Sequence, residues 1–210
     1  MPSDSMKPIF DDFAELLDSR LQGDIPTTED SVRYTLFASM LHHRMRPDSV
    51  VLECPHPAMP GAQLDTRVFG YCEHDVAIEF KYDRRPPGGK NSNRTQKAGS
   101  VFRDLFRLQR ANKETGDTCY FIYLTDMEMH GYFNNPENRH QELYALAPHA
   151  DLLINTSYFS NRPKSFMDEL DDPFEAVITN RSKRTLSGGH HLRIYGVRAP
   201  DLDSRLSASG

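Results

Sequence analysis

The chain has 210 residues, of which 38% are hydrophobic and 26% are charged, so it can build one domain with a sizeable core and does not match a disordered or collagen-like protein. Its net charge of −5, taken alone, argues against a nucleic-acid partner, because phosphate contacts need lysine and arginine. No run approaches the roughly 20 apolar residues of a membrane span, so we expect no membrane association.

The N-terminal residues and the cysteines both indicate a cytoplasmic protein. Acidic side chains stand near the N-terminus, where a secretory signal would need basic and then apolar residues. Cys54, Cys72 and Cys119 lack CxxC spacing and lie in apolar, strand-like segments. We therefore expect buried, reduced thiols and a cytoplasmic location.

Helical and then strand-like periodicity runs through the first half of the chain. Apolar residues at helical spacing predict an amphipathic helix over residues 10–21 and a second helix that begins at Thr27 or Thr28 and ends before Pro47. The period then becomes that of β-strands, joined by connections short enough for an antiparallel meander. The predicted strands span residues 49–54, 63–71 and 75–82.

A basic loop, a helix and a buried strand are predicted after the meander. Prolines, glycines and small polar residues indicate an exposed loop over residues 84–94, and helical spacing returns over residues 96–111. The β-branched and aromatic run 118–124 predicts a central strand covered on both faces. In the less regular last third we expect a helix over residues 138–146, a strand over 151–155, a short helix within 162–172, a strand over 191–197 and a frayed tail over 199–210.

Positive charge is concentrated in one segment. Residues 81–113 contain ten lysines and arginines and two acids, a local charge of +8 that leaves −13 for the rest of the chain. A cationic segment of this kind can follow a phosphate backbone. The side chains that we predict to contact nucleic acid are Arg84, Arg85, Lys90, Arg94, Lys97, Arg103 and Arg107, with Arg110 continuing the same helix face.

Two acids and one lysine are predicted to converge on the meander. Because side chains alternate along a strand, Glu79 and Lys81 share one face of residues 75–82, and pairing with the preceding strand can bring Asp65 onto the same patch. Asp65 and Glu79 supply the one or two carboxylates that Mg²⁺ takes in proteins. Beside such a metal, Lys81 could orient or help deprotonate an attacking water and offset charge on a phosphorane-like transition state. Asp75 is the alternative acid, but its place at the strand start favours a role in the turn.

This pattern resembles the PD-(D/E)XK nuclease superfamily, whose core is a helix, a three-stranded meander, a second helix and a further strand. The resemblance covers residues 29–124 and rests on Asp65 in QLDTRV and on Glu79, Phe80 and Lys81 in IEFKY. No proline precedes Asp65, where many members have one. The resemblance implies that Asp65, Glu79 and the main-chain carbonyl of Phe80 bind Mg²⁺, or Mn²⁺ in its place, and that Lys81 activates water.

Further polar residues are candidates for auxiliary roles. The resemblance implies a glutamate on the first core helix and a polar residue on the second, positions that Glu29 and Gln96 or Lys97 would fill. Glu29 could equally be a carboxylate that the helix dipole favours at a helix start. Glu53 ends an apolar strand beside that of Asp65 and is either a further metal ligand or an acid at the strand edge.

Two pairs of adjacent histidines do not have the pattern of a zinc site. His42 and His43 are neighbours, as are His190 and His191. Neither pair has the i, i+4 spacing that a zinc site on one helix face uses. We expect no metal site at either pair.

These features predict one α/β domain over residues 1–210 with a restriction-endonuclease-like core. Helices flank a central mixed sheet made of the meander and further strands. The core covers about residues 27–125, an N-terminal helix lies in residues 1–26, and residues 126–198 decorate the core.

The predicted function is Mg²⁺-dependent hydrolysis of phosphodiester bonds in DNA by an endonuclease that acts in DNA defence, restriction or DNA processing. Nothing in the sequence separates a DNA substrate from RNA, and cleavage of two strands would suit a homodimer. One alternative is a catalytically silent nucleic-acid-binding or regulatory module of the same fold. Another is an interaction protein in which the acids and the lysine form a surface ion-pair cluster and the acidic remainder binds a basic partner.

Overall fold

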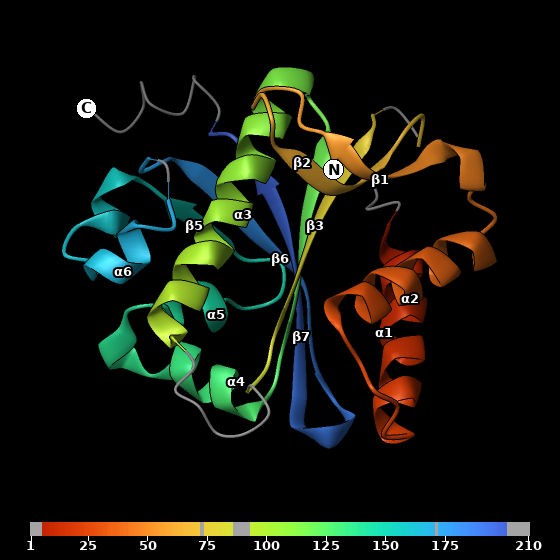
Figure 1. The fold of residues 1–210 in the computed structure, drawn as a ribbon, viewed down its shortest axis with the longest axis horizontal. Helices are drawn as coiled ribbons and strands as arrows, with labels where there is room; N and C mark the ends of the chain where they lie inside the picture. Colours follow the sequence, from red (N-terminus) through yellow and green to blue (C-terminus); the bar gives the residue numbers. More distant parts are fainter. Residues whose placement is uncertain (1–5, 72–73, 86–92, 171, 201–210) are drawn as a thin grey trace.

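The computed structural model describes residues 6–71, 74–85, 93–170 and 172–200, and within them it has a mixed β-sheet with helices on both faces (Figure 1). The strands are β1 (Val50–Pro55), β2 (Gln63–Val68), β3 (Val76–Asp83), β4 (Thr118–Thr125), β5 (Asp151–Ile154), β6 (Ala176–Leu186) and β7 (His190–Arg198). They pair in the order β1-β2-β3-β4-β7-β6-β5. β3 and β4 are parallel, and the other neighbouring pairs are antiparallel. The predicted α/β class and mixed sheet are confirmed.

Two groups of helices cover the two faces of the sheet. The helices are α1 (Lys7–Gln22), α2 (Glu29–His42), α3 (Arg94–Thr115), α4 (Met127–Asn134), α5 (Gln141–Tyr144) and α6 (Lys164–Met167), and short 3₁₀ helices span Pro47–Ser49, Pro136–Asn138, Thr156–Phe159 and Ser187–Gly189. α1 and α2 lie against one face, and α3 to α6 lie on the other (Figure 1). Of the helices in the described residues, none is both long and apolar enough to cross a membrane.

Local capping chemistry sets the ends of the helices that flank β3. Thr28, in extended backbone, accepts a hydrogen bond from the Ser31 amide and caps α2. Asn93 caps α3 in the same way through the Gln96 amide. α3 ends at Gly116, whose φ of 74° is a left-handed conformation that glycine adopts without strain.

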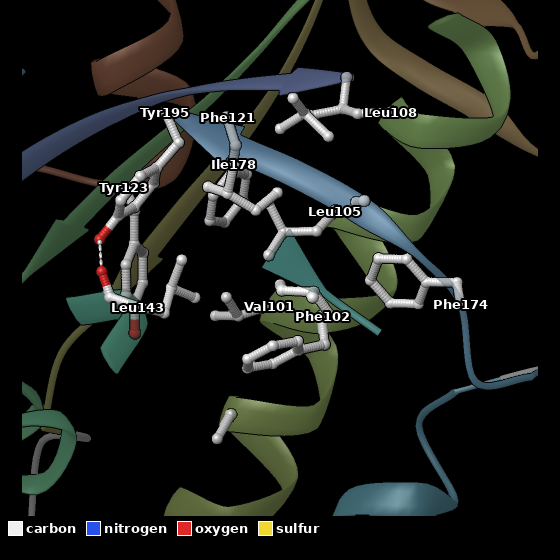
Figure 2. Close-up of a cluster of buried hydrophobic side chains, with 14 of the residues drawn as sticks. Val101, Phe102, Leu105, Leu108, Phe121, Tyr123, Leu143, Phe174, Ile178 and Tyr195 are labelled. Carbon is white, nitrogen blue, oxygen red and sulfur yellow. Dashed lines mark hydrogen bonds between the residues drawn. The ribbon is translucent and has the colours of Figure 1, made fainter. Parts of the chain in front are cut away.

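The sheet separates two hydrophobic cores. The first joins α3 to β4, β6 and β7, and it includes Val101, Phe102, Leu105, Phe121, Ile178 and Tyr195 (Figure 2). The second joins α1 and α2 to the opposite face, and it includes Phe10, Phe13, Leu36, Ile78, Phe80 and Ile122. Because Ile78 and Phe80 point into the second core, the alternation of β3 turns Glu79 and Lys81 toward α3.

The predicted elements from the first helix to β4 are confirmed, with ends shifted by a few residues. β4 is the middle strand of the sheet and is almost fully buried, as its apolar run predicted. The expected helix over residues 138–146 is limited to the short α5, and α4 and β6 were not predicted. β6 was missed because residues 181–185 are polar and lie partly in solvent. β5, β6 and β7, which belong to the segment expected to decorate the core, extend the sheet beyond β4.

Some sequence predictions fall outside the described residues. Cys54 and Cys119 are buried free thiols, as expected. Cys72, residues 86–92 of the expected basic loop with Lys90, and residues 201–210 of the expected tail lie outside the described ranges.

Candidate active site

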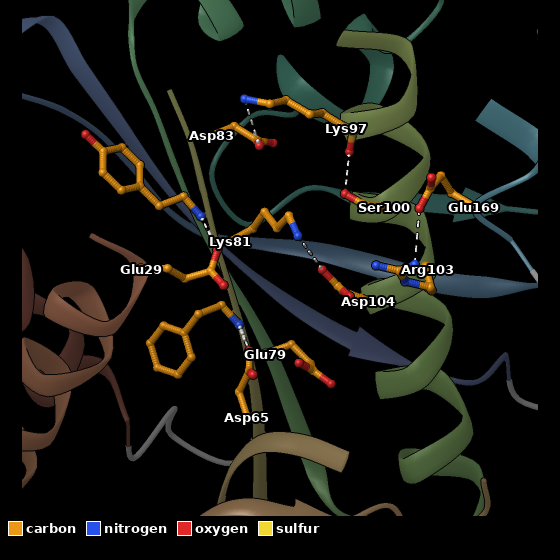
Figure 3. A network of polar contacts seen from close by, with 12 residues as sticks. Glu29, Asp65, Glu79, Lys81, Asp83, Lys97, Ser100, Arg103, Asp104 and Glu169 are labelled. Atoms are coloured by element: carbon orange, nitrogen blue, oxygen red, sulfur yellow. Dashed lines mark hydrogen bonds and ion pairs between the residues drawn. The ribbon is translucent and has the colours of Figure 1, made fainter. Parts of the chain in front are cut away.

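The divergence of β2 from β3 positions two of the predicted acids. β2 pairs with only the first three residues of β3. The amides of Phe80 and Tyr82 therefore donate hydrogen bonds to side chains instead of to the backbone of β2. Asp65 Oδ2 accepts a hydrogen bond from the Phe80 amide at 2.8 Å, and Glu29 Oε2 accepts one from the Tyr82 amide at 2.8 Å. Both carboxylates are thereby fixed along this edge of β3 (Figure 3).

The main chain of β3 presents the Phe80 carbonyl to the same edge. In a β-strand the N–H and C=O groups of one residue point to the same side. Since the Phe80 amide is bonded to Asp65, the Phe80 carbonyl also faces the Asp65 side of β3. The β2–β3 register, continued by one pair, puts Asp65 opposite Glu79. The two predicted metal-binding carboxylates and the predicted carbonyl are therefore neighbours.

Glu79 is a buried acid with an unsatisfied oxygen. The residue is 1% exposed, and its Oε1 has no hydrogen-bond partner. Arg107 Nη1 lies 3.7 Å from this oxygen, beyond hydrogen-bonding distance. Burial, together with the negative charges of Asp65 and Asp104, raises the pKa of Glu79 well above its usual range. A cation close to Oε1 would stabilise the ionised carboxylate.

Neighbouring acids are perturbed in the same direction. Burial raises the pKa of Glu29, although the hydrogen bond from the Tyr82 amide opposes the rise. Burial also raises the pKa of Asp104 to about 7, although the positive charges of Lys81 and Arg107 oppose it. Strongly perturbed acids that gather at one place are typical of functional sites. A bound divalent cation would favour the ionised form of each acid.

Lys81 is held from the other side by an acid of α3. Its Nζ lies 3.9 Å from Asp104 Oδ2 (Figure 3). Asp104 Oδ1 lies 3.5 Å from Arg107 Nη1. Arg107 in turn faces Glu79. The Lys81 side chain is 23% exposed. A chain of alternating charges therefore runs from Lys81 through α3 to Glu79, and Lys81 itself is accessible to solvent.

A second ion pair ties the end of β3 to the start of α3. Asp83 is buried, accepts a hydrogen bond from the Tyr123 hydroxyl at 2.9 Å and lies 3.7 Å from Lys97 Nζ. Burial raises the pKa of Asp83, and the Tyr123 hydroxyl and Lys97 oppose the rise. Lys97 also donates to the Arg84 carbonyl at 2.8 Å. This lysine, which we predicted to contact nucleic acid, therefore also fixes the local structure.

Of the other auxiliary candidates, Glu53 lies across from Asp65 in the β1–β2 register and shares Arg33 with it, and Gln96 lies apart from the acids of β2 and β3. The Glu53 side chain is 69% exposed, and its carboxylate is 4.0 Å from Arg33. Gln96 is exposed at the start of α3 and accepts a hydrogen bond from Asn93 at 2.8 Å. Asp75 accepts a hydrogen bond within the turn between β2 and β3, where we expected it to act. Glu29 therefore lies along the same edge of β3 as Asp65, and Glu53 approaches Asp65 through Arg33.

Acids from other elements neutralise part of the cationic segment. Arg85 and Arg94 lie 3.6 Å and 3.4 Å from the carboxylate of Glu128, and Arg103 lies 3.1 Å from that of Glu169. A charge count along residues 81–113 missed these pairs, because both acids lie far away in the sequence. The surface around the site is therefore less cationic than the segment alone predicts.

Other residues of the site were not predicted to belong to it. Arg33 Nη2 donates to Asp65 Oδ1 at 3.0 Å, a contact that depends on the packing of α2 and has no signal in the sequence. Arg107 was predicted to contact nucleic acid, and it also contacts Glu79. Asp104 had a usable signal, since it is the one acid in residues 94–113, where every other charged residue is basic.

Comparisons with known proteins give no relative for this chain. No family model matches the sequence, and comparisons with curated proteins and with solved structures gave no match either. The function is therefore inferred from the fold and the site.

Proposed function

We propose that the protein is a Mg²⁺-dependent nuclease of the PD-(D/E)XK type that hydrolyses phosphodiester bonds in DNA. The observation that carries the proposal is the Glu79 carboxylate, which is buried, has an oxygen without a hydrogen-bond partner and lies beside Asp65. In a purely structural ion pair, both carboxylate oxygens would normally be satisfied. In a metal site, a carboxylate oxygen with a free lone pair can bind the cation, and Asp65 keeps such lone pairs beside its bonds to Arg33 and the Phe80 amide.

The order of the elements supports a restriction-endonuclease-like core. α2, the meander of β1, β2 and β3, then α3 and β4 follow one another along the chain, and β4 lies parallel to β3. The superfamily core has the same order of helix, three strands, helix and strand. On this interpretation β5, β6 and β7 are an extension of the sheet.

Asp65, Glu79 and the Phe80 carbonyl are the groups that would hold Mg²⁺, with Mn²⁺ as a substitute. All three offer oxygen, the donor that hard divalent cations take, and the free Oε1 of Glu79 fits this role. When bound, the metal would polarise the phosphate and stabilise the charge that develops on it. Glu29, fixed by the Tyr82 amide, would act as the auxiliary acid at the same edge.

Lys81 would act on the attacking water or on the charge of the phosphate. Its side chain is partly exposed, and the ammonium group would contact a substrate from the open side. Asp104 contacts the same group from α3, so it is a positioning residue that acts through Lys81. Arg107 couples this pair to Glu79. The three charged groups would therefore orient one another before substrate binds.

Exposed basic side chains beside the site would hold the nucleic-acid backbone. Arg84 is exposed and follows β3 directly, and its carbonyl is bonded to Lys97 at the start of α3. Backbone contacts of this kind position a duplex without reading its sequence. An enzyme that cuts both strands would suit a homodimer, which light scattering can test, and it would serve DNA defence, restriction or DNA processing.

The second candidate is a nucleic-acid-binding module of the same fold that does not cut. The contacts of Asp104 with Lys81 and Arg107 favour this candidate, because Asp104 neutralises positive charges that would otherwise contact a substrate. Such a module would bind DNA in a salt-sensitive manner and leave it intact.

Incubation of the purified protein with supercoiled plasmid, linear duplex, single-stranded DNA and RNA, in Mg²⁺ and then Mn²⁺, separates the two candidates. A nuclease requires cleavage by the wild type that is lost in Lys81→Ala and in Glu79→Gln. It should be kept in Lys164→Ala, a matched change at an exposed lysine of α6. Cleavage by every sample would indicate a contaminant. Salt-sensitive binding without cleavage in either metal would favour the silent module.

A further inference from the structure

We infer that Asp12, His42 and His43 form a second metal site, for a transition-metal ion such as Zn²⁺, between α1 and α2. Asp12 lies on α1, His42 is the last residue of α2, and His43 follows it. His42 Nδ1 lies 3.0 Å and His43 Nε2 lies 3.8 Å from Asp12 Oδ2. The three ligand atoms all lie within 4.8 Å of one another, and in the described residues no other group of His, Cys, Asp and Glu meets this condition.

The spacing and the donor set both fit a transition metal. Ligand atoms around a tetrahedral Zn²⁺ are about 3.4 Å apart, since each is about 2.0–2.1 Å from the metal. The distances of 3.0 Å and 3.8 Å lie on either side of this value. Two imidazole nitrogens with one carboxylate oxygen suit Zn²⁺, Ni²⁺, Co²⁺ or Cu²⁺, whereas Mg²⁺ prefers oxygen. The site therefore differs in chemistry from the pair of Asp65 and Glu79.

The surroundings favour a cation and leave a coordination position open. Both histidines lie at the C-terminal end of α2, where free carbonyls and the helix dipole favour positive charge. The Asp12 side chain is 19% exposed, whereas that of His42 is 73% exposed. The aspartate is therefore held by the protein, and the open side can take a water or an external ligand.

A metal at this position would join the end of α2 to α1. α1 contributes Phe13 and Leu17 to the second core, and α2 begins with Glu29 of the candidate active site. The metal would stabilise this helix pair whether or not the protein is a nuclease. From the spacing of His42 and His43 we expected no metal site there, because the third ligand lies on another helix, 30 residues before His42.

Calorimetric titration of the EDTA-treated full chain with Zn²⁺ tests the inference, with excess Mg²⁺ present to compete at Asp65 and Glu79. We expect one strong Zn²⁺ site per chain. His42→Ala and Asp12→Asn should weaken it by about tenfold or more, and His74→Ala, at another exposed histidine, should leave it unchanged. Co²⁺ should give visible absorption that is lost in the same two variants.

His42→Ala should fold like the wild type, because the side chain is exposed, and circular dichroism checks this. Zn²⁺ should also raise the melting temperature of the wild type more than that of His42→Ala. Unchanged Zn²⁺ affinity in both His42→Ala and Asp12→Asn, or no binding by the wild type at submillimolar Zn²⁺, would overturn the inference.

Discussion

The two faces of β3 carry opposite chemistry. Toward α1 and α2 the strand presents Ile78 and Phe80, which are buried among apolar side chains. Toward α3 it presents Glu79 and Lys81, which face charged side chains of that helix. One strand therefore serves both a hydrophobic core and the candidate active site.

One face of β3 holds residues that stabilise the fold, and the other holds residues that cost stability. Full burial of Ile78 or Phe80 stabilises the folded state by about 1.5–3 kcal/mol each. Burial of a carboxylate costs free energy unless its partners offset it. The raised pKa values of Glu79 and Asp104 indicate that the neighbouring lysine and arginines offset the free-energy cost of burial only in part. Buried acids with raised pKa values that gather in this way are typical of functional sites.

The largest effect should come from Lys81→Ala on the charged face. We expect cleavage to fall by about 10²–10⁴-fold, the usual contribution of a positioned proton-transfer or charge-stabilising side chain. Most of the loss should appear in kcat, because on the proposed function basic side chains outside the site would hold the DNA. Single-turnover cleavage with matched DNA binding measures the effect. A fall in binding with unchanged kcat would place Lys81 among the DNA contacts instead.

The next largest effect should come from Ile78→Ala on the apolar face. Ile78 is fully buried, so its truncation should lower the free energy of unfolding by about 2–5 kcal/mol. Cleavage per folded molecule should stay near that of the wild type. Urea denaturation and cleavage below the transition measure the two quantities. If the folded variant lost cleavage, the two faces of β3 would not be independent.

An effect with a defined pH dependence is expected at Asp104. Its pKa is raised to about 7 by burial, against about 3.9 for aspartate in an unfolded chain. The folded state therefore binds the proton more tightly, and this contribution to stability is present below about pH 4 and is lost as the pH rises to about 7. From pH 4 to 7, the stability of the wild type should fall relative to that of Asp104→Asn. Urea denaturation at both pH values measures this, and parallel profiles would contradict it.

The smallest effect should come from Arg103→Ala. Its ion pair with Glu169 is partly exposed, and such pairs contribute about 0–1 kcal/mol. Urea denaturation should therefore show a small loss that shrinks further at high salt. A loss as large as that of Ile78→Ala would mean that a partly exposed ion pair of α3 stabilises the fold as much as a buried side chain of β3.

The sequence predicted the core of the fold and the acids of the meander because these depend on local pattern. Period-2 alternation gave β3 and the shared face of Glu79 and Lys81, and short connections gave the pairing that brings Asp65 to them. The helical period of residues 96–111 likewise gave α3. The second half of β6 has no apolar alternation, because it lies partly in solvent, and it was missed.

Contacts that depend on how helices pack could not be predicted. Arg33 meets Asp65 only through the placement of α2. Glu128 and Glu169 neutralise bases of a segment far away in the sequence. Asp12 approaches the two histidines at the end of α2 for the same reason. Residue type and spacing fix none of these neighbours.

Binding of Mn²⁺, followed by electron paramagnetic resonance with and without duplex DNA, tests most directly whether the charged face of β3 holds a divalent cation. The His42→Ala background removes the contribution of the second site. In that background we predict binding that is lost in Glu79→Gln and kept in Glu169→Gln, a matched change at an acid paired with Arg103. Equal binding in the two variants, or no binding even with DNA present, would contradict the metal-site account.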